Sequence, residues 1–341
     1  MLYSLLRPAL FLIDPEPAHA ASIAALKLLP GGAQSAGPLA TTVAGLAFPN
    51  PLGIAAGYDK DGEVPDALLA LGFGFAEVGS ITPLPQAGNP KPRLFRLSED
   101  RAVINRMGFN NGGAEAAVAR LAKRADKPGI VGINVGANKE SPDRVADYAA
   151  MVRLMAPLAS YLAINISSPN TPGLRALQDE GALAALLDAV LAARGAKGPP
   201  VFLKVAPDLE SAEVDAIARI AMDKRVDALI VSNTTISRPH LTSRHAAETG
   251  GLSGAPLHDL ALERLRSFRK ATGGAIPLVG VGGIASAEQA WQRIRAGASL
   301  VQLYSAMTYE GPGIARRIVT GLERLMKRDG FAAIAEAVGS E

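Results

Sequence analysis

The segment YLAINISSPNTPGL, from Tyr161 to Leu174, combines an apolar first half with a polar second half. The first half is rich in β-branched residues and predicts a buried strand of an α/β protein. The second half carries Asn, Ser and Thr between two prolines, which restrict the backbone and pre-orient these side chains. Polar loops at strand ends often carry function. We therefore interpret the segment as a strand that ends in a functional loop; the alternative is a loop that only caps the next helix.

Apolar segments of this kind recur along the chain and alternate with amphipathic segments. They begin near Leu52, Phe75, Ile130, Tyr161, Pro200, Asp227, Ile276 and Ser299. Helices are expected between most of them, for example at 179–194, 211–223, 285–296 and 312–327. Eight strands alternating with helices predict an α/β fold, specifically a (β/α)8 TIM barrel. An open doubly wound sheet is disfavoured because no GxGxxG turn follows the first strand.

Two regions lie outside this repeat. The connection at 82–127 is long for a loop between a strand and the next one, and we expect it to form a functional flap. The residues after 328 are expected to form a fraying helix without an assigned role.

Residues 1–37 are predicted to form a separate N-terminal domain, and residues 38–341 the barrel domain. Two short apolar helices, near 2–13 and 17–29, are joined by a turn in which Asp14 caps the second helix. Neither reaches the ~20 apolar residues that a membrane span needs. We interpret them as an amphipathic hairpin in the membrane interface. The alternatives are a plug at one end of the barrel and a signal peptide ending at 18–20, which would lack the usual leading positive charge.

Composition excludes several classes of function. The 341 residues are 48% hydrophobic, which allows a large core, and the net charge of +3 is too small to indicate nucleic-acid binding. Cysteine is absent, so the chain has no disulfide, thiolate metal ligand or cysteine nucleophile. We expect no metal site, because metal-ligand spacing is also absent among the four histidines, His19, His240, His245 and His258.

Barrel enzymes place their chemistry at the C-terminal ends of the strands. Lys60 and Lys204 follow the first and fifth predicted strands, and their charges would repel unless an anion lay between them. The last two strand ends, at 282–283 and 304–305, have the pattern of a phosphate site. Lys204 would then lie under a ring system, where a cation stabilises a reduced flavin. FMN is favoured over FAD because no adenine pocket is visible.

Several motifs together resemble dihydroorotate dehydrogenase, specifically its class 2, membrane-associated and quinone-dependent form. They are AAGYDKDGE at 55–63, PRLFRL at 92–97, NRMGFNN at 105–111, INISSPNTPGL at 164–174, TGGLSG at 249–254, GVGGI at 280–284 and GASLVQLYS at 297–305. The likeness extends from the N-terminal hairpin to about residue 322.

This resemblance implies oxidation of (S)-dihydroorotate to orotate in pyrimidine synthesis, with one FMN per chain as hydride acceptor and a membrane quinone as final electron acceptor. It implies that Ser168 is the base that removes the C5 proton, and our hypothesis is that Thr171 or a water relays this proton. Class 1 relatives use cysteine at the matching position. The implied residues for dihydroorotate or orotate are Lys60, Asn105, Arg106, Met107, Gly108, Phe109, Asn165, Asn170, Asn233 and Thr234. Taken singly, each of these asparagines could instead cap a loop.

The residues that the resemblance implies for FMN are Ala56, Gly57, Tyr58, Asp59, Lys60, Ser80, Asn134, Asn165, Lys204, Ser232, Gly254, Gly283, Tyr304 and Ser305. Ser80 and Ser232 stand where relatives commonly have threonine, and Tyr58 where leucine is common. A quinone tunnel would be lined by His19, Arg96 and Tyr304. On sequence alone, His19 could equally be a solvent-facing helix residue.

The resemblance further implies a monomer bound peripherally to the cell membrane, on the cytoplasmic face in a bacterium. Three rival interpretations remain. One is a soluble class 1 enzyme, and another is an FMN barrel that reduces pyrimidines in RNA. Both would be expected to use a cysteine that this chain lacks. The third is a non-catalytic phosphate-binding barrel that docks on membranes, which the polar residues at all eight strand ends disfavour.

Overall fold

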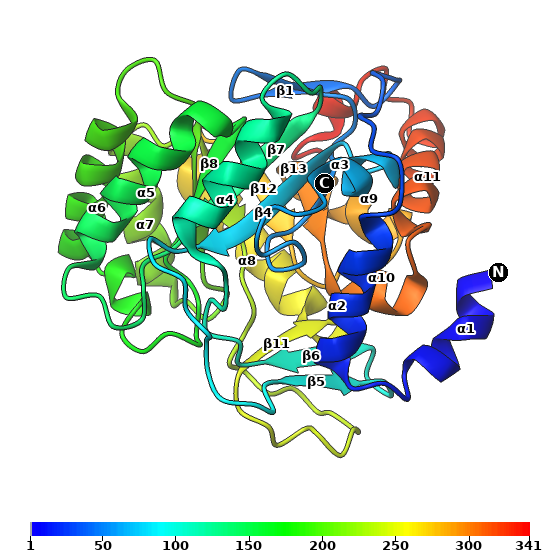
Figure 1. The fold of residues 1–341 in the computed structure, drawn as a ribbon. Helices are drawn as coiled ribbons and strands as arrows, with labels where there is room; N and C mark the ends of the chain where they lie inside the picture. The colour runs from blue at the N-terminus through cyan, green and yellow to red at the C-terminus, as the bar shows by residue number, and fades with distance from the viewer. Residues whose placement is uncertain (1) are drawn as a thin grey trace.

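The computed structural model describes residues 2–341, and its centre is a closed barrel of eight parallel strands (Figure 1). In order around the barrel these are β3 (Leu52–Ile54), β4 (Phe75–Ile81), β7 (Ile130–Val135), β8 (Tyr161–Asn165), β9 (Val201–Val205), β10 (Ala228–Val231), β12 (Leu278–Val281) and β13 (Ala298–Leu303). Each begins within two residues of its predicted start. The predicted (β/α)8 fold is confirmed.

Helices surround the barrel and pack their apolar sides on it. They are α3 (Pro65–Ala70), α4 (Gly113–Leu121), α5 (Arg144–Met155), α6 (Glu180–Arg194), α7 (Ser211–Asp223), α8 (His258–Thr272), α9 (Ala287–Arg295) and α11 (Ile314–Arg328), with the short α10 (Ser305–Glu310) before α11. In α11 the buried Ile314, Ile318 and Leu322 recur every four residues, whereas Arg316 and Arg324 are exposed. This spacing is why the helix covers the barrel with one side only.

The N-terminal end of the barrel is closed by a hairpin that the sequence analysis did not predict. It consists of β1 (Thr41–Val43) and β2 (Leu46–Phe48), which pair antiparallel. The Phe48 ring meets Phe75 at the start of β4, with 5.1 Å between centroids, in an edge-to-face arrangement. This hairpin therefore leaves the opposite end of the barrel, where the strands finish, as the site for chemistry.

The 82–127 segment forms only part of the flap over that end. β5 (Leu94–Leu97) and β6 (Ala102–Asn105) are its hairpin, whereas the barrel helix α4 belongs to the same segment. A third strand, β11 (Gly251–Gly254), comes from a distant loop and pairs with β6. The resulting sheet lies next to α2 below the barrel (Figure 1).

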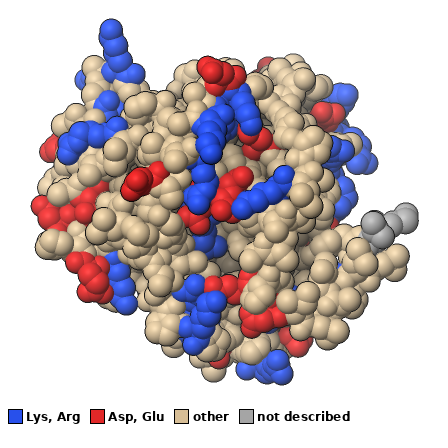
Figure 2. Space-filling model, in the orientation of Figure 1, with Lys and Arg blue, Asp and Glu red and all other residues tan. Residues whose placement is uncertain are grey.

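The N-terminal residues form the two predicted helices, α1 (Leu2–Leu10) and α2 (Pro15–Leu26). Asp14 caps α2, because its Oδ1 accepts the N–H of Glu16 at 3.0 Å. Leu5 and Leu12 are exposed, and few charged side chains lie over α1 (Figure 2). Among residues 2–341, no helix has the length and apolar character to cross a bilayer.

The expectation of a fraying C-terminal helix is wrong. The chain after α11 makes a short 3-10 turn, Ile334–Ala337, whose two end residues are buried in the core. The final residue is also tied down, since Arg266 Nη2 donates to Glu341 at 2.8 Å. The burial of Ile334 and Ala337 fixes this segment on the core. The sequence pattern alone did not indicate that these two residues are buried.

Candidate active site

A cavity of about 690 Å³ runs from the open end of the barrel to the N-terminal helices. Strand ends of the barrel form its polar part, and α1 and α2 form its apolar part. Most of the predicted site residues line it: Lys60, Asn105, Met107, Gly108, Phe109, Asn165, Ser168, Asn170, Asn233, Thr234, Ala56, Gly57, Tyr58, Ser80, Lys204, Ser232, Gly254, Gly283, Tyr304, Ser305, His19 and Arg96. Residues from all seven sequence motifs therefore line the same cavity.

Three predicted residues, Arg106, Asp59 and Asn134, are outside this lining. Arg106 turns to Glu248, with Nη1 and Oε2 2.7 Å apart. Asp59 accepts the backbone N–H groups of the turn at 63–64, each at 2.8 Å, which gives it a structural role in the loop that carries Lys60.

Asn134 lies one layer below the cavity, in a network of buried polar groups. Ser80 Oγ donates to Asn134 Oδ1, and Asn165 Nδ2 donates to the same Ser80 Oγ at 2.9 Å. Asn134 Nδ2 in turn donates to Glu77 at 2.9 Å. Asn134 thus orients Ser80 and Asn165, which do reach the cavity.

Glu77 is a fully buried carboxylate in the barrel interior. It accepts hydrogen bonds from Tyr161 Oη at 2.9 Å and Gln302 Nε2 at 2.8 Å, and its Oε1 lies 3.9 Å from Lys204 Nζ. Burial lowers the pKa of Lys204, and the Glu77 carboxylate acts in the opposite direction. The cavity floor therefore contains one cation that is balanced from below by one anion.

Lys60 and a group of carboxamides provide the donors and acceptors of the barrel mouth. Lys60 Nζ donates to the Gly57 carbonyl at 2.6 Å, and burial lowers the pKa of Lys60 to about 8. Asn170 Nδ2 donates to Asn105 Oδ1 at 3.1 Å, which joins the β8 loop to the flap. One cation with several amides can pair with a planar carboxylate that has amide edges.

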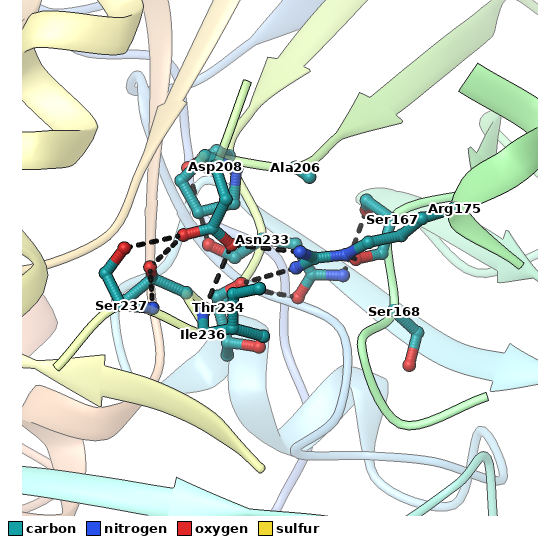
Figure 3. A network of polar contacts seen from close by, with 12 residues as sticks. Ser167, Ser168, Arg175, Ala206, Asp208, Asn233, Thr234, Ile236 and Ser237 are labelled. Atoms are coloured by element: carbon teal, nitrogen blue, oxygen red, sulfur yellow. Dashed lines mark hydrogen bonds and ion pairs between the residues drawn. The ribbon is translucent and has the colours of Figure 1, made fainter. Parts of the chain in front are cut away.

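Ser168 faces this group from the loop after β8. Its side chain is buried, lines the cavity, and is directed away from the polar network around Asp208 (Figure 3). Its Oγ accepts the Asn170 N–H at 3.3 Å. Thr171, on the same loop, has a buried Oγ1 without a hydrogen-bond partner among residues 2–341. Thr171 itself does not line the cavity.

The phosphate pattern falls at the ends of β12 and β13. Gly283 has φ +69°, and a Cβ there would lie 2.5 Å from His258 Cα, so only glycine fits. Ser305 begins α10, and its Oγ donates to Ser253 at 2.8 Å. Backbone N–H groups of a glycine turn and a hydroxyl form a donor set that suits a phosphate group.

The apolar part of the cavity begins at a cluster of rings. His19 on α2 lies edge-on to Tyr58 with centroids 5.1 Å apart, and Tyr304 is 5.6 Å from Tyr58. Burial lowers the pKa of His19 to about 3, and the charge of Lys60 adds to this effect. His19 is therefore neutral and not solvent-facing. Arg96 donates to backbone carbonyls of the α1–α2 connection.

A sequence model of the family described as "Dihydroorotate dehydrogenase" matches residues 38–326. The chain belongs to the dihydroorotate dehydrogenase family. A relative from Erythrobacter litoralis named "Dihydroorotate dehydrogenase (quinone)" is 72% identical and matches 100% of both chains. One of the same name from Novosphingobium aromaticivorans is 69% identical over 99% of both. The crystal structure of DHODH from Eimeria tenella in complex with ferulenol is 39% identical, with a TM-score of 0.92 over 96% of this chain and 95% of that one.

In this member of the dihydroorotate dehydrogenase family, sequence reasoning missed Glu77, Arg175 and Asp208. Glu77 interrupts an otherwise apolar strand, FAEVGSI, which is a signal of a buried charge with a partner. Arg175 and Asp208 are charged residues beside the loops that follow β8 and β9. Their spacing in sequence gives no indication that they meet.

Proposed function

We propose that this protein oxidises (S)-dihydroorotate to orotate in pyrimidine synthesis and passes the electrons to a membrane quinone, with one FMN bound at the barrel mouth. The observation that carries the proposal is the continuous cavity, which has Ser168 and carboxamides at one end and the apolar helices at the other. When bound, FMN would accept the hydride from C6 of the substrate and later release its electrons to the quinone. The names of the relatives support the same activity.

The cofactor site is proposed from the donors that fit FMN. Gly283, Ser305 and neighbouring N–H groups would hold its phosphate. Lys204 would lie beside the ring system and favour its reduced, anionic form, with Ser80 and Asn165 at a polar ring edge. Asn134 would act indirectly through Ser80.

The substrate site is proposed on the carboxamide side. Lys60 would attract the carboxylate, and Asn105, Asn170 and Asn233 would pair with the amide edges. Ser168 would remove the C5 proton. Serine is a weak base at neutral pH, so the proton must move on. The unpaired hydroxyl of Thr171 on the same loop supports our hypothesis that Thr171 or a bound water is the relay.

The quinone site is proposed at the N-terminal helices. Residues 1–37 would form a membrane-facing domain on the 38–341 barrel, since exposed leucines surround the apolar end of the cavity. A quinone entering there would pass Arg96 and His19 and reach Tyr304. We further propose a monomer bound peripherally to the membrane, on its cytoplasmic side in a bacterium.

An anaerobic half-reaction tests the proposal. The purified protein should be yellow, and dihydroorotate should bleach it in the absence of quinone. The Ser168→Ala variant should be bleached about 10²–10⁴ times more slowly, while orotate still perturbs its flavin spectrum. A colourless protein, or unchanged reduction kinetics in the variant, would contradict the proposed cofactor or the proposed base, respectively.

A further inference from the structure

One ion pair joins three loops at the barrel mouth (Figure 3). Arg175 follows the β8 loop, and Asp208 follows β9; Nη1 and Oδ2 are 3.0 Å apart. Their side chains are 22% and 10% exposed, so the pair is largely shielded from water. Neither residue lines the cavity. Any effect of this pair on the reaction must therefore be exerted through the residues it holds.

Arg175 uses its guanidinium in three directions. Besides the bond to Asp208, Nε donates to the Ser167 carbonyl at 3.1 Å, and Nη2 donates to the Thr234 carbonyl at 3.2 Å. Ser167 precedes Ser168, and Thr234 belongs to the predicted substrate site. Arginine donates to these acceptors from three separate nitrogens of a rigid, planar fork, whereas lysine has its three N–H donors on one nitrogen and cannot reproduce this arrangement.

Asp208 organises the other side of the pair. Its carboxylate accepts the Ile236 N–H at 3.1 Å and the Ser237 hydroxyl at 3.2 Å, and Thr235 Oγ1 donates to it as well. These bonds hold the loop that follows β10. A further link joins the loops directly, since Asn233 Nδ2 donates to Ser167 Oγ at 3.0 Å.

We propose that the Arg175–Asp208 pair is a positioning device that fixes Ser168 relative to Asn233 and Thr234. This inference rests on the proposed function, because it concerns the approach of the base to C5 of a substrate that is held by those two residues. A misplacement of about 1 Å at a reacting group can cost ~10²-fold in rate. The pair is thus expected to act on proton removal and not on the cofactor or quinone ends of the cavity.

The test uses Arg175→Lys, which keeps the charge and loses the three-way fork. At saturating dihydroorotate, anaerobic flavin reduction should slow ~10²-fold, and deuterium at C5 should slow the variant more than the wild type. FMN content and the rate of reoxidation by quinone should stay at wild-type values. A merely structural role would instead change FMN retention and both half-reactions. Asp208→Asn provides a second variant with the same expected pattern should Arg175→Lys fold poorly.

Arg194→Lys is the matched control. Arg194 pairs with Asp227 at 3.1 Å, with side chains 21% and 30% exposed, but at the opposite end of the barrel. The Arg194→Lys variant should keep the wild-type rate of flavin reduction. Equal reduction rates in Arg175→Lys, Asp208→Asn and the control would overturn the positioning role while leaving the proposed function intact. If dihydroorotate fails to reduce the wild type, the proposed function is refuted and this inference with it.

Discussion

The affinity for orotate should depend on pH through Lys60. Burial lowers the pKa of this ammonium to about 8; Arg93 acts in the same direction, and Asp61, Glu16 and Asp59 act against it. Only the protonated form attracts a carboxylate. With a pKa of about 8, the charged fraction falls from about 90% at pH 7 to about 10% at pH 9. The dissociation constant of orotate should therefore rise about tenfold over this interval.

The measurement is a titration of the flavin absorbance of the holoenzyme with orotate at pH 7, 8 and 9. The Lys60→Met variant is the control, because any ionisation of orotate or of the flavin would appear in it unchanged. It should bind orotate more weakly at pH 7 and lack the rise that begins near pH 8. A wild-type dissociation constant that is the same at pH 7 and pH 9, or an equal rise in Lys60→Met, would refute the reasoning.

Three further predictions concern the other parts of the cavity. The imidazole of His19, whose pKa is lowered to about 3, should show no titration between pH 5 and 8 in NMR spectra; a midpoint near 6.5 would contradict its burial. Glu77→Gln leaves the charge of Lys204 uncompensated and should raise the flavin reduction potential by roughly 30 mV, which corresponds to a tenfold change for two electrons; a lower or unchanged potential in a dye-coupled reduction would argue against the pair. Deleting residues 1–37 should abolish turnover with a long-chain quinone and spare flavin reduction by dihydroorotate, and normal turnover of a membrane quinone would dismiss the role of these helices.

The barrel was predictable because its strands are buried on both sides. All four residues of β10, ALIV, are buried, for example, so they form an apolar run whose limits are clear in sequence. The β1–β2 hairpin and β11 were not predictable in this way. They are three or four residues long, and β11 pairs with β6 across roughly 150 residues of sequence, which no local pattern encodes.

The convergence of the site residues was predictable because parallel strands of a barrel all end on one side. The direction in which each side chain points was less predictable from sequence. Asn134 lies near the end of β7 and Asp59 lies within a matched motif, yet Asn134 points into a polar layer below the cavity and Asp59 caps a turn. Successive side chains of a strand point to opposite sides. A sequence pattern can therefore place a residue at the end of a strand, but it does not determine what that side chain contacts.

Burial affects the ionisable groups in both the polar and the apolar part of the cavity. His19 on α2 and Lys60 at the barrel mouth both have pKa values lowered by burial, and the charge of Lys60 contributes to the shift at His19. A neutral imidazole at this boundary avoids placing a second cation beside the ammonium that would bind the substrate. The same apolar cover that would suit a quinone keeps this imidazole uncharged, so it adds no repulsion to Lys60, and one cavity could then accept a charged metabolite at one end and a lipid at the other.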